Sequence, residues 1–523
     1  MRSKLKQPPT FDLQLFSHKW EKKMGVIKYL IVFKLKLWLI VILGIPAFIS
    51  CNNNDIPPNI VFIIADDLAW DDLGCYGHPN IQTPNIDKLA ANGMRFENAF
   101  LTTSSCSPSR ASIITGKYPH QTNAEQLHWP LPAEQVTFVE KLKDAGYWTG
   151  QAGKWHLGEA VKDRFHKIME VPVGGFQLQE DGSMETSTNE SGCEDWIPIL
   201  NSRDKTKPFF LWLAAVDPHR DYKSGIIANP HSLNDVILPP YIPDTKEVRK
   251  DFTLYYDEIA RLDSFVGDFI SELEKQQLTD NTLILFISDN GRPFPREKTT
   301  LYDGGIKTPW IVKWPGKIKP GSTTKSMVSS VDIGATFLKL AGIDNFEESE
   351  GLDFTKILFN PNVEIRSSVY AEDHWHDFED FSRAIRTKKF KYIRNFYPDL
   401  PNTPSADALR SLTFRSMQKL RDEENLNSEQ MACFISPRAE EELYDVINDP
   451  FELNNLAEKP EYSQILQELQ IEMNKIRLKT NDTIPAKRTP DEFDRETGQP
   501  NKYRIRPRPS KAEMWKVFER KNY

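Results

Sequence analysis

The chain has 523 residues, a formal net charge of −8, 39% apolar residues and 27% charged residues. This length exceeds what one hydrophobic core usually holds, so we expect two domains of ordinary soluble, globular composition. Residues 1–50 hold nine Lys or Arg and only two Asp or Glu, so the remainder is more acidic than the total. An acidic main body argues against nucleic acid as a partner and requires a local basic site for any anionic ligand.

The first 50 residues have the pattern of an export signal. Lysines precede the apolar run Leu37 to Ile49, whose 13 residues are few for a membrane span and typical of a signal peptide. Cys51 follows directly after Ser50, which resembles the lipidation site of bacterial lipoproteins. We therefore expect Cys51 to be the lipidated first residue of a cell-envelope protein, anchored to a bacterial membrane and facing the periplasm or the surface. A plain signal peptide or an uncleaved anchor is the alternative, and Met24 is a second possible start.

Short apolar runs alternate with helical patterns, which predicts an α/β core with a large, mostly parallel sheet between helices. We predict strands at 59–65, 96–101, 147–152, 209–216 and 282–288, and helices at 83–93, 134–145, 253–273 and 332–340. A basic hairpin at 381–396 and a helix at 463–478 predict a smaller C-terminal α+β domain with an antiparallel sheet. We place the core at 51–345, the second domain at 346–480 and a basic extension at 481–523.

Acidic residues follow two of the predicted buried strands. Asp66 and Asp67 come after 59–65, and Asp289 and Asn290 come after 282–288. Because parallel strands present their carboxyl ends at one edge, we expect these side chains to lie together. Adjacent carboxylates repel unless a cation lies between them, and oxygen ligands suit Ca²⁺ or Mg²⁺ better than zinc. A solvated turn or a helix cap is the alternative for Asp66 and Asp67.

A cysteine in a Ser/Thr-rich turn precedes a helical pattern that ends at Gly116. Cys106 stands two residues before Pro108, which suits the first turn of a helix, and Arg110 stands four residues after the cysteine. A helix N-terminus and an arginine both favour an anion. The alternative for this pattern alone is a buried free cysteine. Three further cysteines, Cys75, Cys193 and Cys433, show no metal spacing, so we expect thiols with at most one disulfide.

Basic residues follow two other predicted strands. Lys154 and His156 come after 147–152 and, being two apart, could share one face of an extended segment. His219 follows 209–216 after a proline. For Lys154 and His156, a surface lysine and a hydrogen-bonded histidine are the alternative.

Together these segments resemble the formylglycine-dependent sulfatases, which have the alkaline phosphatase-like fold. The resemblance runs from about Pro58 to Ala457 and rests on separated motifs in one order, which are more specific than one pentapeptide. The motifs are Asp66-Asp67, Cys106-Ser-Pro-Ser-Arg110, Gly153-Lys-Trp-His-Leu-Gly158, Asp217-Pro-His219, Ser288-Asp-Asn-Gly291 and Leu443 to Glu452.

The resemblance implies a sulfuric ester hydrolase in which a maturing enzyme oxidises Cys106 to formylglycine, whose hydrated aldehyde attacks sulfur. It implies a calcium ion held by Asp66, Asp67, Asp289, Asn290 and the modified Cys106. The implied catalytic residues are Cys106, Arg110, Lys154, His156, His219 and Lys298. The implied substrate-binding residues are His128, Lys154, His219, Arg220 and Lys298. Lys298 stands four residues before Tyr302, as the second sulfate-binding lysine does in many sulfatases. Lys307 is its rival and matches a structural arginine.

The stretch from Val236 to Pro295 is especially similar to the sulfamidase branch, which removes N-sulfate from glucosamine in heparan-type glycosaminoglycans. Asp303-Gly-Gly-Ile-Lys307 instead follows the general O-sulfatase pattern. Bacterial relatives of this branch include ulvan-active enzymes, so we expect a sulfated polysaccharide or its oligosaccharides as substrate, with an algal one such as ulvan favoured and an N-sulfated glycosaminoglycan as the alternative. Two other classes are an alkaline-phosphatase-like phosphoryl-transfer enzyme and an inactive carbohydrate-binding lipoprotein; Cys106, the single-metal set and the retained charged positions argue against both.

Overall fold

The computed structural model describes residues 57–171, 177–178, 184–185, 190–344 and 346–502. The predicted export signal with Cys51 lies outside these residues, and so do residues 503–523 of the predicted extension. Within the described ranges, no helix is both long enough and apolar enough to cross a membrane.

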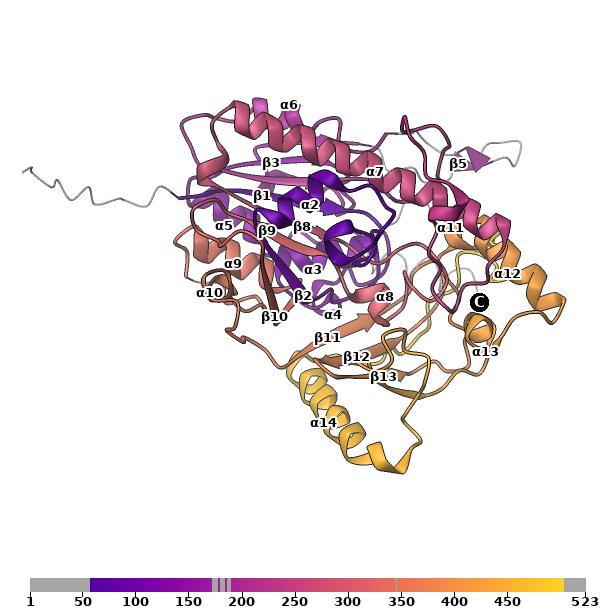
Figure 1. The fold of residues 1–523 in the computed structure, drawn as a ribbon. Coiled ribbons are helices and arrows are strands. Elements are labelled where there is room, and N and C mark those ends of the chain that lie inside the picture. Colours follow the sequence, from indigo (N-terminus) through magenta and orange to yellow (C-terminus); the bar gives the residue numbers. More distant parts are fainter. Residues whose placement is uncertain (1–56, 172–176, 179–183, 186–189, 345, 503–523) are drawn as a thin grey trace, which may run out of the picture. The chain divides into compact units, whose positions relative to one another are not determined.

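The central element is an eight-stranded sheet with the strand order β10-β2-β9-β8-β1-β7-β3-β4 (Figure 1). Neighbouring strands are parallel except at β9, which runs antiparallel to β2 and β8. The predicted mixed, mostly parallel sheet is therefore confirmed. Its strands are β1 (Asn59–Ala65), β2 (Met94–Phe100), β3 (Trp148–Gly153), β4 (Lys167–Glu170), β7 (Phe209–Ala214), β8 (Thr282–Ser288), β9 (Trp310–Lys313) and β10 (Ser322–Ser329). β5 (Gln177–Leu178) and β6 (Met184–Glu185) form a separate two-stranded sheet.

Helices cover both faces of this sheet, as its apolar strands predict. Along β1, Val61 and Ile63 face one hydrophobic core, whereas Phe62 and Ile64 face the other. Alternate residues of one strand thus enter two cores, so the strand is buried on both sides. The first core includes α2 (Pro84–Ala91), α6 (Trp196–Asn201) and α7 (Lys246–Lys275). The second includes α3 (Cys106–Thr115), α5 (Phe138–Asp144), α9 (Asp332–Leu340) and α10 (Thr355–Phe359).

Threonine caps explain why two helices begin several residues away from their predicted starts. Thr137 Oγ1 accepts the Glu140 backbone N–H at 3.3 Å, so α5 begins at Phe138 rather than near residue 134. Thr245 Oγ1 accepts the Val248 N–H at 3.2 Å, so α7 begins at Lys246, seven residues before the predicted start.

The second sheet is antiparallel and has four strands in the order β11-β12-β13-β14. They are β11 (Ser368–Asp373), β12 (Ser382–Thr387), β13 (Phe390–Asn395) and β14 (Glu441–Asp445). The predicted hairpin is thus β12–β13. One face of the sheet packs against α14 (Ser463–Thr480), where Leu469 and Met473 join its core (Figure 1). The predicted smaller antiparallel sheet is therefore confirmed.

The other face of the second sheet packs against the segment that carries Lys298. Leu301, Tyr302 and Ile306 share a core with residues of β11 to β14. Asp303 adds a buried ion-pair network to this contact, because it binds Arg386 at 2.9 Å and Lys391 at 2.6 Å. The second sheet is thereby fixed next to the candidate site.

The remaining α-helices of the described residues lie in connecting segments. They are α4 (Pro119–Thr122), α8 (Asp303–Ile306), α11 (Ala406–Leu409), α12 (Leu412–Asp422) and α13 (Ser428–Met431). The described residues from Pro57 onward form one compact unit, so the domain boundaries at 345 and 480 stay predictions. The described part of the extension is attached to the second sheet, since Asp482 pairs with Arg383 at 2.6 Å.

Candidate active site

Four neighbouring strands end at the same level of the sheet. The register pairs Ala65 with Ser288, Ile64 with Ala214, and Gly153 with Ala214. Gly153 has a φ of +90°, and a Cβ there would overlap the carbonyl oxygens of Ala214 and Gly192, so this strand end requires glycine. The residues that follow these four ends therefore gather at one edge, as predicted.

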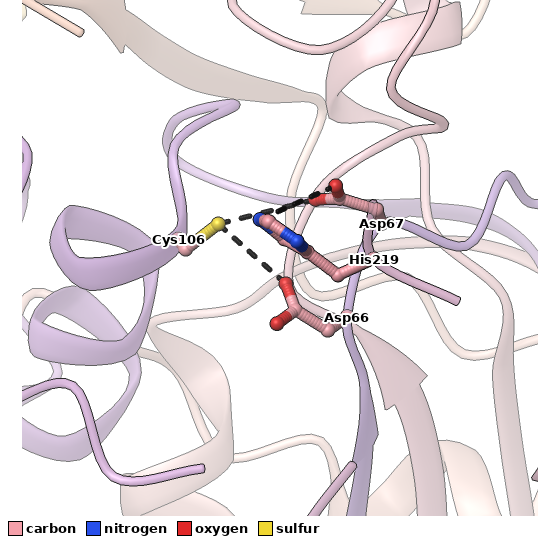
Figure 2. A group of neighbouring side chains, drawn as sticks. All are labelled: Asp66, Asp67, Cys106 and His219. Carbon is pink, nitrogen blue, oxygen red and sulfur yellow. Dashed lines mark hydrogen bonds and ion pairs between the residues drawn. The ribbon is translucent and has the colours of Figure 1, made fainter. Parts of the chain in front are cut away.

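Cys106 enters this group from the N-terminus of α3 (Figure 2). Its Sγ lies 3.5 Å from Asp66 Oδ1 and 3.9 Å from Asp67 Oδ1. Burial raises the pKa of the Cys106 thiol well above its ordinary value, so the unmodified side chain is neutral at neutral pH. Cys75, Cys106, Cys193 and Cys433 are all free thiols, which for Cys75, Cys193 and Cys433 agrees with the prediction of thiols with at most one disulfide.

Three cationic side chains contact the carboxylates of this group. Arg110 Nε donates to Asp289 Oδ2 at 2.8 Å, and Lys298 Nζ donates to Asp67 Oδ2 at 2.8 Å. Lys154 Nζ donates to Asp66 Oδ2. All six side chains are buried, so each ion pair is held away from solvent. The inner group thus contains three carboxylates and three cationic groups.

Opposing effects set the pKa values in this group. Burial would raise the pKa of Asp66, but Lys154 and the other nearby cations hold it below its usual range. Burial and the Asp66 carboxylate raise the pKa of Asp289 to about 6. Burial would lower the pKa of Lys154 and Lys298, but the facing carboxylates raise both, so both ammonium groups stay charged.

The donor set fits a hard divalent cation. Asp66, Asp67, Cys106 and His219 offer ligand atoms within 4.8 Å of one another. Asn290 Nδ2 donates to Asp67 Oδ1 at 2.5 Å, while the buried Asn290 Oδ1 has no hydrogen bond within the described part of the chain. Asp289 Oδ1 also faces Asp67, accepting its backbone N–H at 3.4 Å. A buried amide oxygen without a hydrogen bond, on a residue that contacts Asp67, is a ligand that such a cation would bind.

His219 lies beside the carboxylates with one ring nitrogen directed at them (Figure 2). Its Nδ1 is paired with the Arg220 carbonyl oxygen, which can only accept, so Nδ1 carries a proton. Its Nε2 lies 3.8 Å from Asp67 Oδ2. Nε2 is therefore the ring nitrogen that faces the carboxylates.

The side chain of His156 contacts His128, and His156 does not continue an extended segment with Lys154. The φ of His156 is +59°, so the predicted extended segment does not reach this residue. His156 Nε2 and His128 Nδ1 are 2.6 Å apart, and His156 Nδ1 is buried without a hydrogen bond among the described residues. Burial, followed by Lys154 and Arg110, lowers the pKa of His156 well below its ordinary value. His156 is therefore neutral.

Two basic residues near the motifs have other partners. Arg220 forms two hydrogen bonds with Asp251, at 2.8 and 2.9 Å, and thereby ties the loop after β7 to α7. Its guanidinium also stacks over Tyr222 and Phe294. The Lys307 ammonium lies 3.5 Å from the centre of the Trp70 ring. Arg220 thus positions the His219 loop, and Lys307 packs on an aromatic ring.

Two side chains next to the site were not predicted from the sequence. Asp407 Oδ2 lies 3.8 Å from His219 Nε2 and 4.0 Å from Lys298 Nζ. His376 Nδ1 lies 2.6 Å from Oγ of Ser105, the residue before Cys106. Both belong to segments beyond the first sheet, and no local pattern marked them as site residues.

Comparison with protein families gives two matches. A family model described as sulfatase matches residues 58–343. A model described as the C-terminal region of N-sulphoglucosamine sulphohydrolase matches residues 296–405. The first match contains every strand end described above, and the second contains Lys298 and the hairpin of the second sheet.

Individual relatives agree with these matches. An ulvan-active sulfatase of Formosa agariphila is 31% identical over 449 residues, which cover 80% of this chain and 74% of that protein. Human N-sulphoglucosamine sulphohydrolase is 28% identical over 467 residues, which cover 82% of this chain and 91% of that protein. A solved structure of a protein with its substrate D-glucosamine-2-N,6-O-disulfate has a TM-score of 0.62 at 23% identity, covering 82% of this chain and 99% of that one, and supports the fold.

Proposed function

The chain belongs to the sulfatase family, and we propose that it hydrolyses sulfate esters of a sulfated polysaccharide or of its oligosaccharides. The observation that carries this proposal is the position of Cys106. Its side chain lies at a helix N-terminus against Asp66 and Asp67, among Arg110, Lys154 and Lys298. This arrangement combines the family's nucleophile position with cations that suit an anionic substrate.

Formylglycine at position 106 is the proposed nucleophile, formed from Cys106 by a maturing enzyme. When present, this group supplies an oxygen nucleophile toward sulfur and a second hydroxyl that permits sulfate release. The unmodified residue is a poor substitute, because its buried thiol is neutral and only a thiolate is strongly nucleophilic. Arg110 lies beside this position and would stabilise negative charge there.

Calcium is the proposed cation, held by Asp66, Asp67, Asp289, Asn290 and the modified residue 106. The oxygen donors suit Ca²⁺ or Mg²⁺, and the sulfatase membership favours calcium. When bound, the ion would stabilise negative charge on the oxygens beside residue 106.

Separate side chains provide binding and proton transfer. Lys154 and Lys298 stay charged and would bind the sulfate oxygens. His219 would donate a proton from Nε2 to the leaving sugar oxygen, since its Nδ1 is already paired with a carbonyl. The neutral His156, with His128 on its Nε2, would accept a proton from residue 106. Binding of the anion and transfer of protons thus fall to different residues.

Ulvan or its oligosaccharides are the substrate class that we favour. An ulvan-active sulfatase is among the relatives at 31% identity. The C-terminal match to N-sulphoglucosamine sulphohydrolase supports a second candidate, an N-sulfated glucosamine in a heparan-type chain. This match includes Lys298, one of the two lysines that we propose bind the sulfate group.

The cell envelope is the proposed location. This proposal is based on the apolar run Leu37 to Ile49, which is followed by Ser50 and Cys51. A lipid anchor on Cys51 would hold the enzyme at a bacterial membrane, where it can act on polymers too large to enter the cell.

Release of sulfate and phosphate from matched substrates tests the proposed function. The enzyme is produced with and without a formylglycine-generating maturase and is assayed on ulvan oligosaccharides, heparan fragments, 4-nitrophenyl sulfate and 4-nitrophenyl phosphate. We expect maturase-dependent sulfate release from one saccharide class and from the aryl sulfate. Phosphate release at comparable rates would support the phosphoryl-transfer alternative. If neither sulfate nor phosphate were released from any substrate, the result would support the inactive carbohydrate-binding alternative.

A further inference from the structure

Asp407 lies in α11, a short helix whose position is fixed by the second sheet. The Ala406 backbone N–H donates to Asp377 Oδ2 at 3.0 Å, which holds the start of α11. The residue before Asp377, His376, contacts Ser105 beside Cys106. These contacts join α11 to the nucleophile loop. Asp407 therefore has a defined position relative to residue 106.

The Asp407 carboxylate has an unused hydrogen-bond acceptor. Oδ1 accepts the Ala408 N–H at 2.9 Å. Oδ2 is buried and forms no hydrogen bond of normal geometry among the described residues, although the Ser405 hydroxyl lies close enough to the carboxylate to lower its pKa and the whole side chain is 12% exposed. The distances of 3.8 and 4.0 Å from Oδ2 to His219 and Lys298 exceed those of hydrogen bonds. A buried acceptor without a donor is costly, so a donor from a ligand would stabilise it.

We propose that Asp407 Oδ2 accepts a hydrogen bond from a hydroxyl group of the sugar unit that carries the sulfate. This inference rests on the proposed function and assigns a specificity-determining residue to the same site. Because Oδ2 faces the nitrogen that would protonate the leaving oxygen, it lies on the sugar side of the sulfate. A hydroxyl next to the sulfated carbon would be its partner.

The charges around Asp407 favour a neutral donor over an ammonium group. Burial would raise the pKa of Asp407, but Lys298 and His219 hold it below its usual range. Asp407 is therefore an anion whose charge is already compensated by neighbouring basic residues. An amine would add a further positive charge beside Lys298, whereas a hydroxyl supplies the missing donor without changing the charge.

Kinetics of Asp407 variants on two kinds of substrate test this inference. Asp407→Ala and Asp407→Asn are compared with the wild type on 4-nitrophenyl sulfate and on ulvan oligosaccharides or heparan fragments, whichever the wild type desulfates. We expect Asp407→Ala to lower kcat/KM for the saccharide at least tenfold more than for the aryl sulfate. Asp407→Asn keeps an acceptor oxygen and should lose less. Asp399→Asn, an exposed acid paired with Arg488, is the control and should change neither value.

Other outcomes overturn the inference. Equal losses on both substrates, with Asn as harmful as Ala, would mean that Asp407 only positions His219 and Lys298. In that case a series of aryl sulfates would also show a changed dependence on the leaving-group pKa. An unchanged saccharide reaction would remove any role for Asp407. A wild type that hydrolyses the aryl sulfate but neither saccharide would also refute it, whereas no sulfate release at all would refute the proposed function itself.

Discussion

Lys298 Nζ lies 2.8 Å from Asp67 Oδ2, with both side chains buried. Lys154 makes the same kind of contact with Asp66. The two lysines that are proposed to bind sulfate therefore form ion pairs with two carboxylates that are proposed to bind the cation. A cation that takes over Asp66 and Asp67 would deprive the two lysines of their partners, so the cation and the anion should not bind independently.

We expect calcium and inorganic sulfate to bind cooperatively. Calorimetric titration of sulfate should give an affinity about 5- to 150-fold higher with saturating calcium than in EDTA, the range typical of coupled sites. Sulfate should raise the calcium affinity by the same factor. Asp289→Asn should weaken calcium binding, and Asp399→Asn should not. A sulfate affinity that is the same with calcium and in EDTA would refute the coupling. Metal analysis that finds two zinc ions per chain would favour a phosphatase-like site.

The pair between Arg110 and Asp289 should matter strongly for stability. Its two side chains are fully buried, so Arg110→Ala leaves an uncompensated charge. We expect this change to lower the free energy of unfolding by about 3–5 kcal/mol in urea titrations of the metal-free protein. Arg488→Ala removes one partner of an exposed pair and should cost at most about 1 kcal/mol. Similar losses for both variants would contradict this difference.

Cys106 should be the one cysteine of the described chain that a maturase converts. It stands in the Cys-x-Pro-x-Arg motif, whereas Cys75, Cys193 and Cys433 do not. Mass spectrometry of peptides from enzyme made with the maturase should show loss of the thiol at residue 106 only. The other three cysteine peptides are internal controls. Full activity in protein with unmodified Cys106 would exclude formylglycine as the nucleophile.

His219→Ala should slow the hydrolysis of a substrate more strongly when its leaving group needs protonation. An activated aryl sulfate has a good leaving group, whereas a sugar oxygen requires a proton as the bond breaks. We expect about 10²- to 10⁴-fold loss of kcat on the saccharide and a much smaller loss on 4-nitrophenyl sulfate. A plot of rate against leaving-group pKa should become steeper in the variant. Equal losses on all substrates would assign His219 to sulfate binding instead.

Cys51→Ala should release the protein from membranes of its native host. The prediction follows from Ser50-Cys51 at the end of an apolar run. Cell fractionation with immunoblotting gives the measurement, and Cys75→Ala serves as the matched control. Protein that stays with the membrane after Cys51→Ala would indicate an uncleaved anchor.

Local sequence was sufficient to predict much of the first sheet. Apolar runs of seven residues before Asp66 and Asp289 coincide with β1 and β8 at both ends. Strands buried on both faces have few other possible structures, and parallel strands bring their carboxyl ends together. For these reasons the sequence also predicted that Asp66, Asp67, Asp289 and Asn290 lie together.

Contacts between distant segments could not be predicted in the same way. The left-handed φ of His156 and its contact with His128 depend on how the loop after β3 folds back. Asp407 reaches His219 because α11 is held by Asp377 and the second sheet packs on the Lys298 segment. The sequence by itself determined strands β1, β2, β3, β7 and β8, the nucleophile turn and the carboxylates at the strand ends, since these follow from local periodicity and strand direction. Only the tertiary structure decided which side chains from the second sheet's connections complete the site, because packing between non-adjacent segments has no local pattern.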